Sequence, residues 1–115
     1  MQKNSINKVF LVGHLGANPE SRYTPAGRSV SAFSLATNES WSSAEGKQSE
    51  HTEWHHVVAW DKLADFSQQY LYKGQLVSVE GKIQSRSWDN KAGQKIKTTE
   101  IIASNIVPLE WKKDD

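Results

Sequence analysis

The chain has 115 residues and a mass of 12.9 kDa, which corresponds to a single domain. It contains no cysteine, so disulfides, thiolate metal sites and cysteine nucleophiles are excluded. The formal net charge of +1 indicates no polyanionic partner by itself, but five tryptophans beside three tyrosines and three phenylalanines are unusual in so small a protein.

Alternating apolar and polar residues predict strands in the first half of the chain. Residues 6–15 and 30–38 alternate with strand period. Residues 16–27 lie between them and contain two proline turn signals. The polar, serine-rich segment 39–50 predicts a loop, and residues 52–60 a third strand.

A helix is predicted after the third strand. Asp61 is a suitable N-cap, and apolar side chains follow at helical spacing, at Leu63, Phe66, Tyr70 and Leu71. Gly74 predicts the helix end, with Lys73 in the last turn. The remaining residues predict a fourth strand, a glycine-containing turn and a fifth strand, over residues 75–88, 89–94 and 95–107.

The order of three strands, one helix and two strands predicts an all-β protein with one helix. It matches the OB-fold, a five-stranded Greek-key barrel. Residues 75–88 would span about 45 Å if extended, whereas a domain of this length has a radius of gyration of about 13 Å. The outer part of the fourth and fifth strands therefore predicts a β-hairpin that projects from the barrel.

The tryptophans fall on the less apolar faces of their strands. In the third strand, Trp54, His56, Val58 and Trp60 share one face, opposite Glu53, His55, Val57 and Ala59. In the fourth strand, Lys82, Gln84, Arg86 and Trp88 share one face, and the core face carries Val77, Val79, Gly81 and Ile83. These rings either cover a second small core or form an exposed binding surface.

The small net charge conceals an uneven distribution. Residues 1–37 and 82–97 are basic, with net charges of about +3 and +4, whereas residues 38–61 carry about −4. Basic side chains interleaved with exposed aromatic rings suit single-stranded nucleic acid, since cations follow the phosphates and rings stack on unpaired bases.

Other kinds of chemistry have little support. His55 and His56 point to opposite faces of a strand, and no carboxylate–histidine pattern matches a metal motif, so no metal and no cofactor are expected. No phosphate-binding loop or placed catalytic triad is visible, so the chain is predicted not to be an enzyme. No apolar run could span a membrane, and we expect a cytoplasmic protein.

Several segments together identify a resemblance that runs from about Ile6 to Leu109. The chain resembles the bacterial-type single-stranded DNA-binding proteins, a family also found in mitochondria. The segments that carry the resemblance include Asn7-Lys8-Val9, Leu11-Val12-Gly13, Leu15-Gly16, Thr52-Glu53-Trp54-His55, Tyr70-Leu71, Lys73-Gly74, Val79-Glu80-Gly81 and Thr98-Thr99-Glu100.

The resemblance implies a homotetramer of OB-folds that binds single-stranded DNA without sequence preference in replication, recombination and repair, at the bacterial nucleoid. The stacking aromatics of the family fall on Trp41, Trp54, Trp60 and Trp88, and its basic contacts on Lys8, Lys62, Lys73 and Arg86. His56, between Trp54 and Trp60 on one face, is added to the candidate site. His55 matches a position at the subunit interface, although a hydrogen-bonded barrel histidine would look the same.

Residues 1–109 are the expected DNA-binding domain, and residues 110–115 the start of a flexible C-terminal tail. The family usually continues into an acidic tip that recruits replication and repair proteins, so such partners are expected only if a tail exists beyond this chain. Two rival functions stay open: an RNA-binding module of the cold-shock type, and an OB barrel that binds oligosaccharide or protein. Trp111 has no predicted role.

Overall fold

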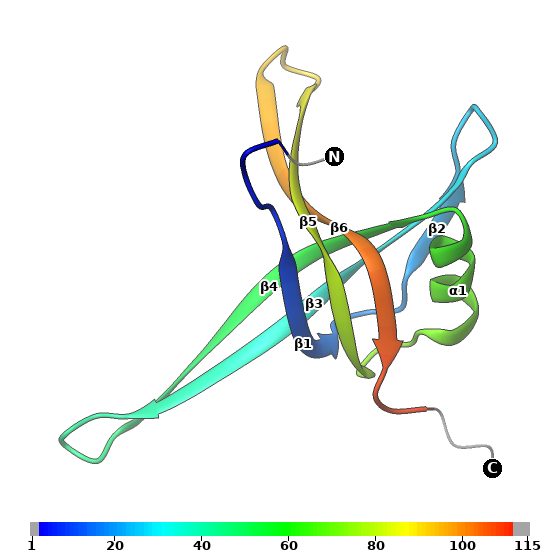
Figure 1. Cartoon of the computed structure of the whole chain (residues 1–115). Helices are drawn as coiled ribbons and strands as arrows, with labels where there is room; N and C mark the ends of the chain where they lie inside the picture. Colours follow the sequence, from blue (N-terminus) through cyan, green and yellow to red (C-terminus); the bar gives the residue numbers. More distant parts are fainter. Residues whose placement is uncertain (1–2, 112–115) are drawn as a thin grey trace.

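The computed structural model describes residues 3–111, which form six strands and one helix (Figure 1). In chain order these are β1 (Val9–Leu15), β2 (Glu20–Tyr23), β3 (Ser29–Ser42), β4 (Gln48–Trp60), α1 (Lys62–Tyr70), β5 (Leu76–Asp89) and β6 (Lys95–Pro108). The strands are hydrogen-bonded in the order β1-β5-β6-β4-β3-β2, and an additional β1–β3 pairing closes the sheet. The predicted five-stranded barrel with one helix is confirmed, with β2 as a short addition along β3.

Strand β1 closes the barrel because it pairs on both sides. It lies antiparallel to β5 from Val9 opposite Gly81 onward, and its last two residues pair with β3. At Gly13 the neighbouring strand comes so close that a Cβ atom would overlap the carbonyl oxygen of Ala36. A glycine is therefore required where β1 passes between β5 and β3.

The barrel interior is filled by alternate apolar residues of the strands. Leu35, Val57, Val77 and Val79 are fully buried, as period-two alternation predicts for the inner face. Helix α1 lies against the barrel, where Leu63 and Phe66 pack on the core (Figure 1). Helix and strands thus build one hydrophobic core and leave the opposite strand faces available for function.

The outer halves of β5 and β6, residues 84–99, project beyond the barrel as the sequence predicts (Figure 1). We call this hairpin the β5–β6 arm. The radius of gyration is 16.7 Å, above the roughly 13 Å of a compact domain of this length. The predicted core face ends earlier than expected, because Ile83 lies where the strand leaves the barrel and is 49% exposed.

A second projecting hairpin replaces the loop predicted over residues 39–50. Strand β3 runs to Ser42 and β4 begins at Gln48, with continuous pairing between them. Only the short turn from Ser43 to Lys47 connects them, closed by a 2.8 Å backbone hydrogen bond. The loop prediction is wrong because both faces of this β3–β4 arm, residues 38–52, are solvated, so no apolar alternation marks the strands.

Two smaller predictions also need correction. The turn segment 16–27 contains β2, whose four residues are all exposed and pair with Ser29–Ala32 of β3. Helix α1 starts after Asp61 as predicted, but the Asp61 side chain makes no capping hydrogen bond. The helix ends at Tyr70, so Lys73 does not lie in its last turn.

The chain continues along the barrel beyond Leu109. The Glu110 carbonyl accepts a 2.7 Å hydrogen bond from the buried Gln75 side chain, and the Glu110 carboxylate accepts one from the Leu76 amide. Trp111 lies edge-on to Tyr70 of α1, with 5.9 Å between ring centroids. Residues 112–115 of the predicted tail lie outside the described residues.

Candidate nucleic-acid interface

Strand β6 joins the two faces that the sequence analysis treated separately. It lies antiparallel to β5 on one side and parallel to β4 on the other, with Val58 opposite Ile102. Because paired residues point to the same side of a sheet, the Trp54–Trp60 face of β4 and the Lys82–Trp88 face of β5 form one continuous surface. Glu100 and Ile102 of β6 lie between them.

A groove of about 290 Å³ lies on this surface. We call it the central groove. It is lined by Glu20, Arg22, Val30, Ala32, His56, Val58, Trp60, Gln84, Arg86, Glu100 and Ile102. Three of the predicted site residues, His56, Trp60 and Arg86, therefore come together here from strands β4 and β5.

Glu100 connects two of these residues. Its side chain is only 8% exposed, its Oε1 accepts a 3.0 Å hydrogen bond from Arg86 Nε, and its Oε2 lies 3.4 Å from His56 Nε2. A buried carboxylate is stable only when it is paired, and Arg86 supplies the pairing cation. The hydrogen bond holds Arg86 beside Glu100 in the central groove, and His56 lies close to the other carboxylate oxygen.

Trp60 is half-buried, and a guanidinium covers its ring. The Cζ atom of Arg28 lies 4.6 Å from the Trp60 ring centroid, a cation–π distance. Arg28 also donates two hydrogen bonds to the Asp61 carboxylate, at 3.2 and 2.8 Å, which lowers the pKa of Asp61. Arg28 therefore already covers part of the Trp60 ring in the absence of a ligand.

Trp54 and Trp88 are more open. Trp54 is 58% exposed and sits beside Gly16, where a Cβ atom would lie 2.5 Å from its ring. Trp88, on the β5–β6 arm, is 44% exposed, and its indole N–H donates a 3.1 Å hydrogen bond to Thr98. Each ring is held at one edge, Trp54 by Gly16 and Trp88 by Thr98. The rest of each ring is open to solvent, where a flat ligand could stack.

Trp41 lies apart from this surface. It is 50% exposed and belongs to the β3–β4 arm, opposite Ser49. Trp41 lies on the same side of β3 as the core residues Phe33 and Leu35, whereas Trp54 of β4 lies on the opposite side of the sheet. The arm also carries the acidic residues Glu39 and Glu50. The structure does not bring Trp41 to the central groove, and its contact with a ligand stays a prediction.

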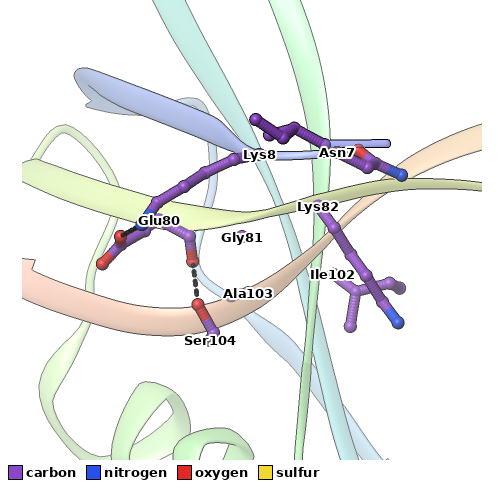
Figure 2. Close-up of a pocket in the computed structure, with 9 residues that line it drawn as sticks. Asn7, Lys8, Glu80, Gly81, Lys82, Ile102, Ala103 and Ser104 are labelled. Carbon is purple, nitrogen blue, oxygen red and sulfur yellow. Dashed lines mark hydrogen bonds and ion pairs between the residues drawn. The ribbon is translucent and has the colours of Figure 1, made fainter. Parts of the chain in front are cut away.

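Lys8 lies in a neighbouring hollow of about 460 Å³, next to the central groove, where Ile102 lines both (Figure 2). The Lys8 ammonium lies 2.6 Å from the Glu80 carboxylate, and Ser104 donates a hydrogen bond to the Glu80 carbonyl. Lys82 projects from the same hollow beside Ile102 (Figure 2). Lys8 is therefore near the central groove but already has a carboxylate partner.

The other predicted residues lie outside the central groove. Lys62 opens α1 two residues after Trp60, and Lys73 follows α1, its amide bonded to the Asn18 side chain; both are exposed. His55 points away from the Trp54 face, and its Nε2 lies 2.9 Å from the Thr37 hydroxyl. This contact fits the hydrogen-bonded barrel histidine, and the interface role stays a prediction.

Sequence reasoning missed Glu100, Arg22, Arg28 and Gly16. Arg22 and Arg28 were visible as members of the basic N-terminal segment. Glu100 had a clearer signal, since an acid next to Ile101 and Ile102 in a strand is either paired or functional. Gly16 and its role under Trp54 had no signal, because the contact joins a turn to a distant strand.

The described residues contain neither a metal-binding cluster nor a membrane-spanning helix. Among residues 3–111, no three His, Asp or Glu side chains lie close enough to hold a metal ion. No helix there has the length and apolarity that crossing a membrane requires.

Comparison with curated proteins gives clear relatives. The chain is 52% identical over 108 residues to single-stranded DNA-binding protein 1 of Chlorobaculum tepidum, covering 93% of this chain and 67% of that protein. It is 43% identical over 111 residues to the single-stranded DNA-binding protein of Neisseria meningitidis serogroup A, covering 96% and 64%. The chain thus spans about two thirds of the length of these relatives.

Solved structures agree in fold. A Plasmodium falciparum SSB in complex with ssDNA superimposes with a TM-score of 0.82 and 34% identity, covering 96% of this chain and all of that one. A deletion mutant of the Thermus aquaticus single-stranded DNA binding protein gives a TM-score of 0.78 and 34% identity, over 91% and 51%. The profile of the Single-strand binding protein family matches residues 6–109, which confirms the resemblance and the prediction of a binding protein rather than an enzyme. The chain belongs to the Single-strand binding protein family.

Proposed function

We propose that this chain binds single-stranded DNA without sequence preference and protects it during replication, recombination and repair. The observation that carries the proposal is the continuous face of β4, β6 and β5, on which the open rings of Trp54 and Trp88 flank His56, Trp60 and Arg86. The names of the relatives and the ssDNA in the Plasmodium complex support the same ligand.

Bases stack on the rings and phosphates contact the cations. Each stacked base contributes about 1–3 kcal/mol, and every base has a π-face, so sequence tolerance follows. Lys8, Lys62, Lys73 and Arg86 are the proposed phosphate contacts, and Trp41 is proposed as a separate stacking ring on the β3–β4 arm. Duplex DNA hides its base faces in the stack and is therefore expected to bind far more weakly.

The proposed assembly is a homotetramer. Large apolar side chains of β1 point outward, with Phe10 66% and Val12 47% exposed, and Val107 of β6 lies on the same outer face. Burial against a second copy would remove this surface from water. His55 is the proposed interface residue, and light scattering that gives about 13 kDa at micromolar concentration would refute the tetramer.

The proposed DNA-binding domain is residues 1–109, and the hydrogen bonds of Glu110 favour its extension through Trp111. Recruitment of replication and repair proteins is proposed only for a form with an acidic segment beyond residue 115. The proposed location is the cytoplasm, at the bacterial nucleoid, because single-stranded DNA arises there.

Fluorescence titration with oligo-dT tests the function. We expect strong quenching of tryptophan emission, weaker at high salt, and little quenching by a duplex of equal length. Equal quenching by duplex and single strand contradicts the proposal. Competition with a matched RNA oligomer separates the cold-shock alternative, and the absence of salt dependence would favour the oligosaccharide- or protein-binding alternative.

A further inference from the structure

Arg28 lies against Trp60 but does not line the central groove. Trp60 is paired with Val30, and the next pair along the same face, Val58 with Ala32, lies further into the groove. Arg28 lies two residues before Val30, so it falls on the same side of the sheet and one step beyond Trp60 in the opposite direction. Trp60 therefore lies between Arg28 and the groove.

An indole ring has two faces, and Arg28 covers one of them. The Cζ atom of Arg28 lies 4.6 Å from the centroid of the Trp60 ring. Trp60 is among the residues that line the central groove and Arg28 is not, which places the guanidinium on the side of the ring away from the groove. The side toward the groove is left for a base.

Arg28 is itself held in place at both ends. Its Nε and Nη2 donate hydrogen bonds of 3.2 and 2.8 Å to the Asp61 carboxylate, and its carbonyl accepts one of 2.8 Å from the Thr24 amide. The backbone of Asp61 is tied to Ser29 by two more bonds, from the Asp61 amide to the Ser29 carbonyl and from the Ser29 hydroxyl to the Asp61 carbonyl. The turn before β3 and the turn after β4 thus fix the guanidinium relative to the ring.

We propose that Arg28 is a positioning residue for DNA binding, which together with Asp61 holds the Trp60 ring in one orientation so that its groove side stacks on a base. This inference rests on the proposed function. A side chain that becomes fixed only when a ligand binds loses conformational entropy, at a cost of about two- to tenfold in affinity. Because Arg28 fixes the ring beforehand, that cost is avoided when DNA binds.

Asp61 gives the inference a sign that charge alone does not predict. Asp61 is an anion close to a surface for a polyanion, so electrostatics alone predicts that its removal strengthens binding. If Asp61 holds Arg28 behind Trp60, Asp61→Asn instead weakens binding. The reason is that an amide has a single acceptor oxygen and no charge, so the two-bond pairing with Arg28 is lost.

A double-mutant cycle tests whether Arg28 acts through Trp60. Anisotropy of a dye-labelled oligo-dT measures binding without depending on tryptophan emission. We expect Arg28→Ala to weaken binding by about two- to tenfold in the chain that keeps Trp60, and to have no effect in the Trp60→Ala background. The salt slope should not change, because no phosphate contact is lost.

Two further variants refine the comparison. Arg28→Lys keeps a cation beside the ring but not the planar, two-bond pairing with Asp61, so it should recover only part of the loss. Lys47→Met removes one positive charge from an exposed position on the turn of the β3–β4 arm. It is the control for charge alone and should bind as the wild type does.

Each outcome decides the question. An equal loss for Arg28→Ala in both backgrounds, or a salt slope reduced by about 0.7, means that Arg28 contacts a phosphate directly and overturns the inference. Unchanged or stronger binding by Arg28→Ala, or stronger binding by Asp61→Asn, also overturns it. In these cases the wild type still binds oligo-dT and the proposed function stands, whereas absence of binding by the wild type contradicts the proposed function. The Arg28 and Asp61 side chains are 55% and 56% exposed, so both variants are expected to fold.

Discussion

Trp54 rests against Gly16, and no side chain other than hydrogen could stand at residue 16 without moving the indole. A Cβ atom there would lie 2.5 Å from Cζ3 and 3.0 Å from Cη2 of the ring. The Gly16 amide is also bonded to the Ser34 carbonyl, so the backbone is held in place on β3. The turn after β1 therefore sets the position of the Trp54 ring on β4.

Gly16→Val should weaken binding of single-stranded DNA with little loss of stability. The new side chain displaces the Trp54 ring, and part of the roughly 1–3 kcal/mol of one stacked base is lost, up to about 150-fold in affinity. Oligo-dT titration and a thermal melt measure the two effects. Ala17→Val, at the exposed neighbouring position, is the control that should bind normally; equal weakening in both variants would contradict the role of Gly16.

Trp54→Ala and Trp111→Ala should have opposite effects. Trp54 is mostly exposed, so its loss should reduce affinity by about 1–3 kcal/mol while the melting temperature changes little. Trp111 packs edge-on against Tyr70 of α1, so its loss should lower the melting temperature and leave DNA affinity unchanged. A large drop in melting temperature for Trp54→Ala would show that this ring is part of a second core.

Alternation along single strands was enough to predict which side chains share a face. It placed Trp54, His56 and Trp60 together on β4, and Lys82, Arg86 and Trp88 together on β5. It could not show that the two faces are one surface, because that depends on the parallel pairing of β4 with β6. Glu100 was missed for the same reason: its partners come from two other strands.

The salt dependence of binding should distinguish paired from unpaired cations. If Lys8, Lys62, Lys73 and Arg86 each neutralise a phosphate, the slope of log K against log salt is about −2.8 per protomer. Lys8 and Arg86 already have carboxylate partners, whereas Lys62 and Lys73 have no ion pair within residues 3–111. If only Lys62 and Lys73 release counterions when they bind phosphate, the slope is about −1.4 per protomer. We therefore expect a measured slope between about −1.4 and about −2.8.

A slope outside this range would change the set of contacts. Glu80→Gln frees Lys8 from its partner and should make the slope steeper, whereas Glu45→Gln, on the turn of the β3–β4 arm, should leave it unchanged. Titrations at four or more salt concentrations are sufficient for the measurement.

The Arg28–Asp61 pair predicts a pH-dependent term in stability. The hydrogen bond from Arg28 lowers the pKa of Asp61, so the stabilisation is present at neutral pH and is lost as pH falls below about 4. Asp61→Asn lacks it at every pH. The difference in melting temperature between the wild type and Asp61→Asn should therefore be greatest near pH 7 and shrink toward pH 3.

Asparagine suits this comparison because it tolerates the positive φ of 56° at residue 61, so any backbone effect is the same at every pH. The pair is exposed, and the difference is expected to be small. A gap that does not change with pH would mean that the ion pair contributes nothing measurable to stability.

The β3–β4 arm shows why part of the fold escaped prediction. Its hydrogen bonds are regular, yet its side chains are polar on both faces, as in the 2.7 Å bond between Thr52 and Asn38. Such a strand has no alternating apolar pattern in its sequence, and it is recognised only by its hydrogen bonds to the partner strand. The β5–β6 arm was predictable because it continues a strand, β5, whose barrel half carries the buried valines Val77 and Val79.

The double pairing of β1 also fixes an order of assembly. Val9 pairs with Gly81 while Leu15 pairs with Leu35, so β1 cannot complete its pairing until β5, which lies much later in the chain, is present. The two long hairpins need only local turns and can form earlier, since closing a short loop costs less chain entropy. We expect pulse-labelled amide exchange during refolding to protect Val57 and Val58 before Leu11 and Val12; the reverse order would mean that β1 nucleates the barrel.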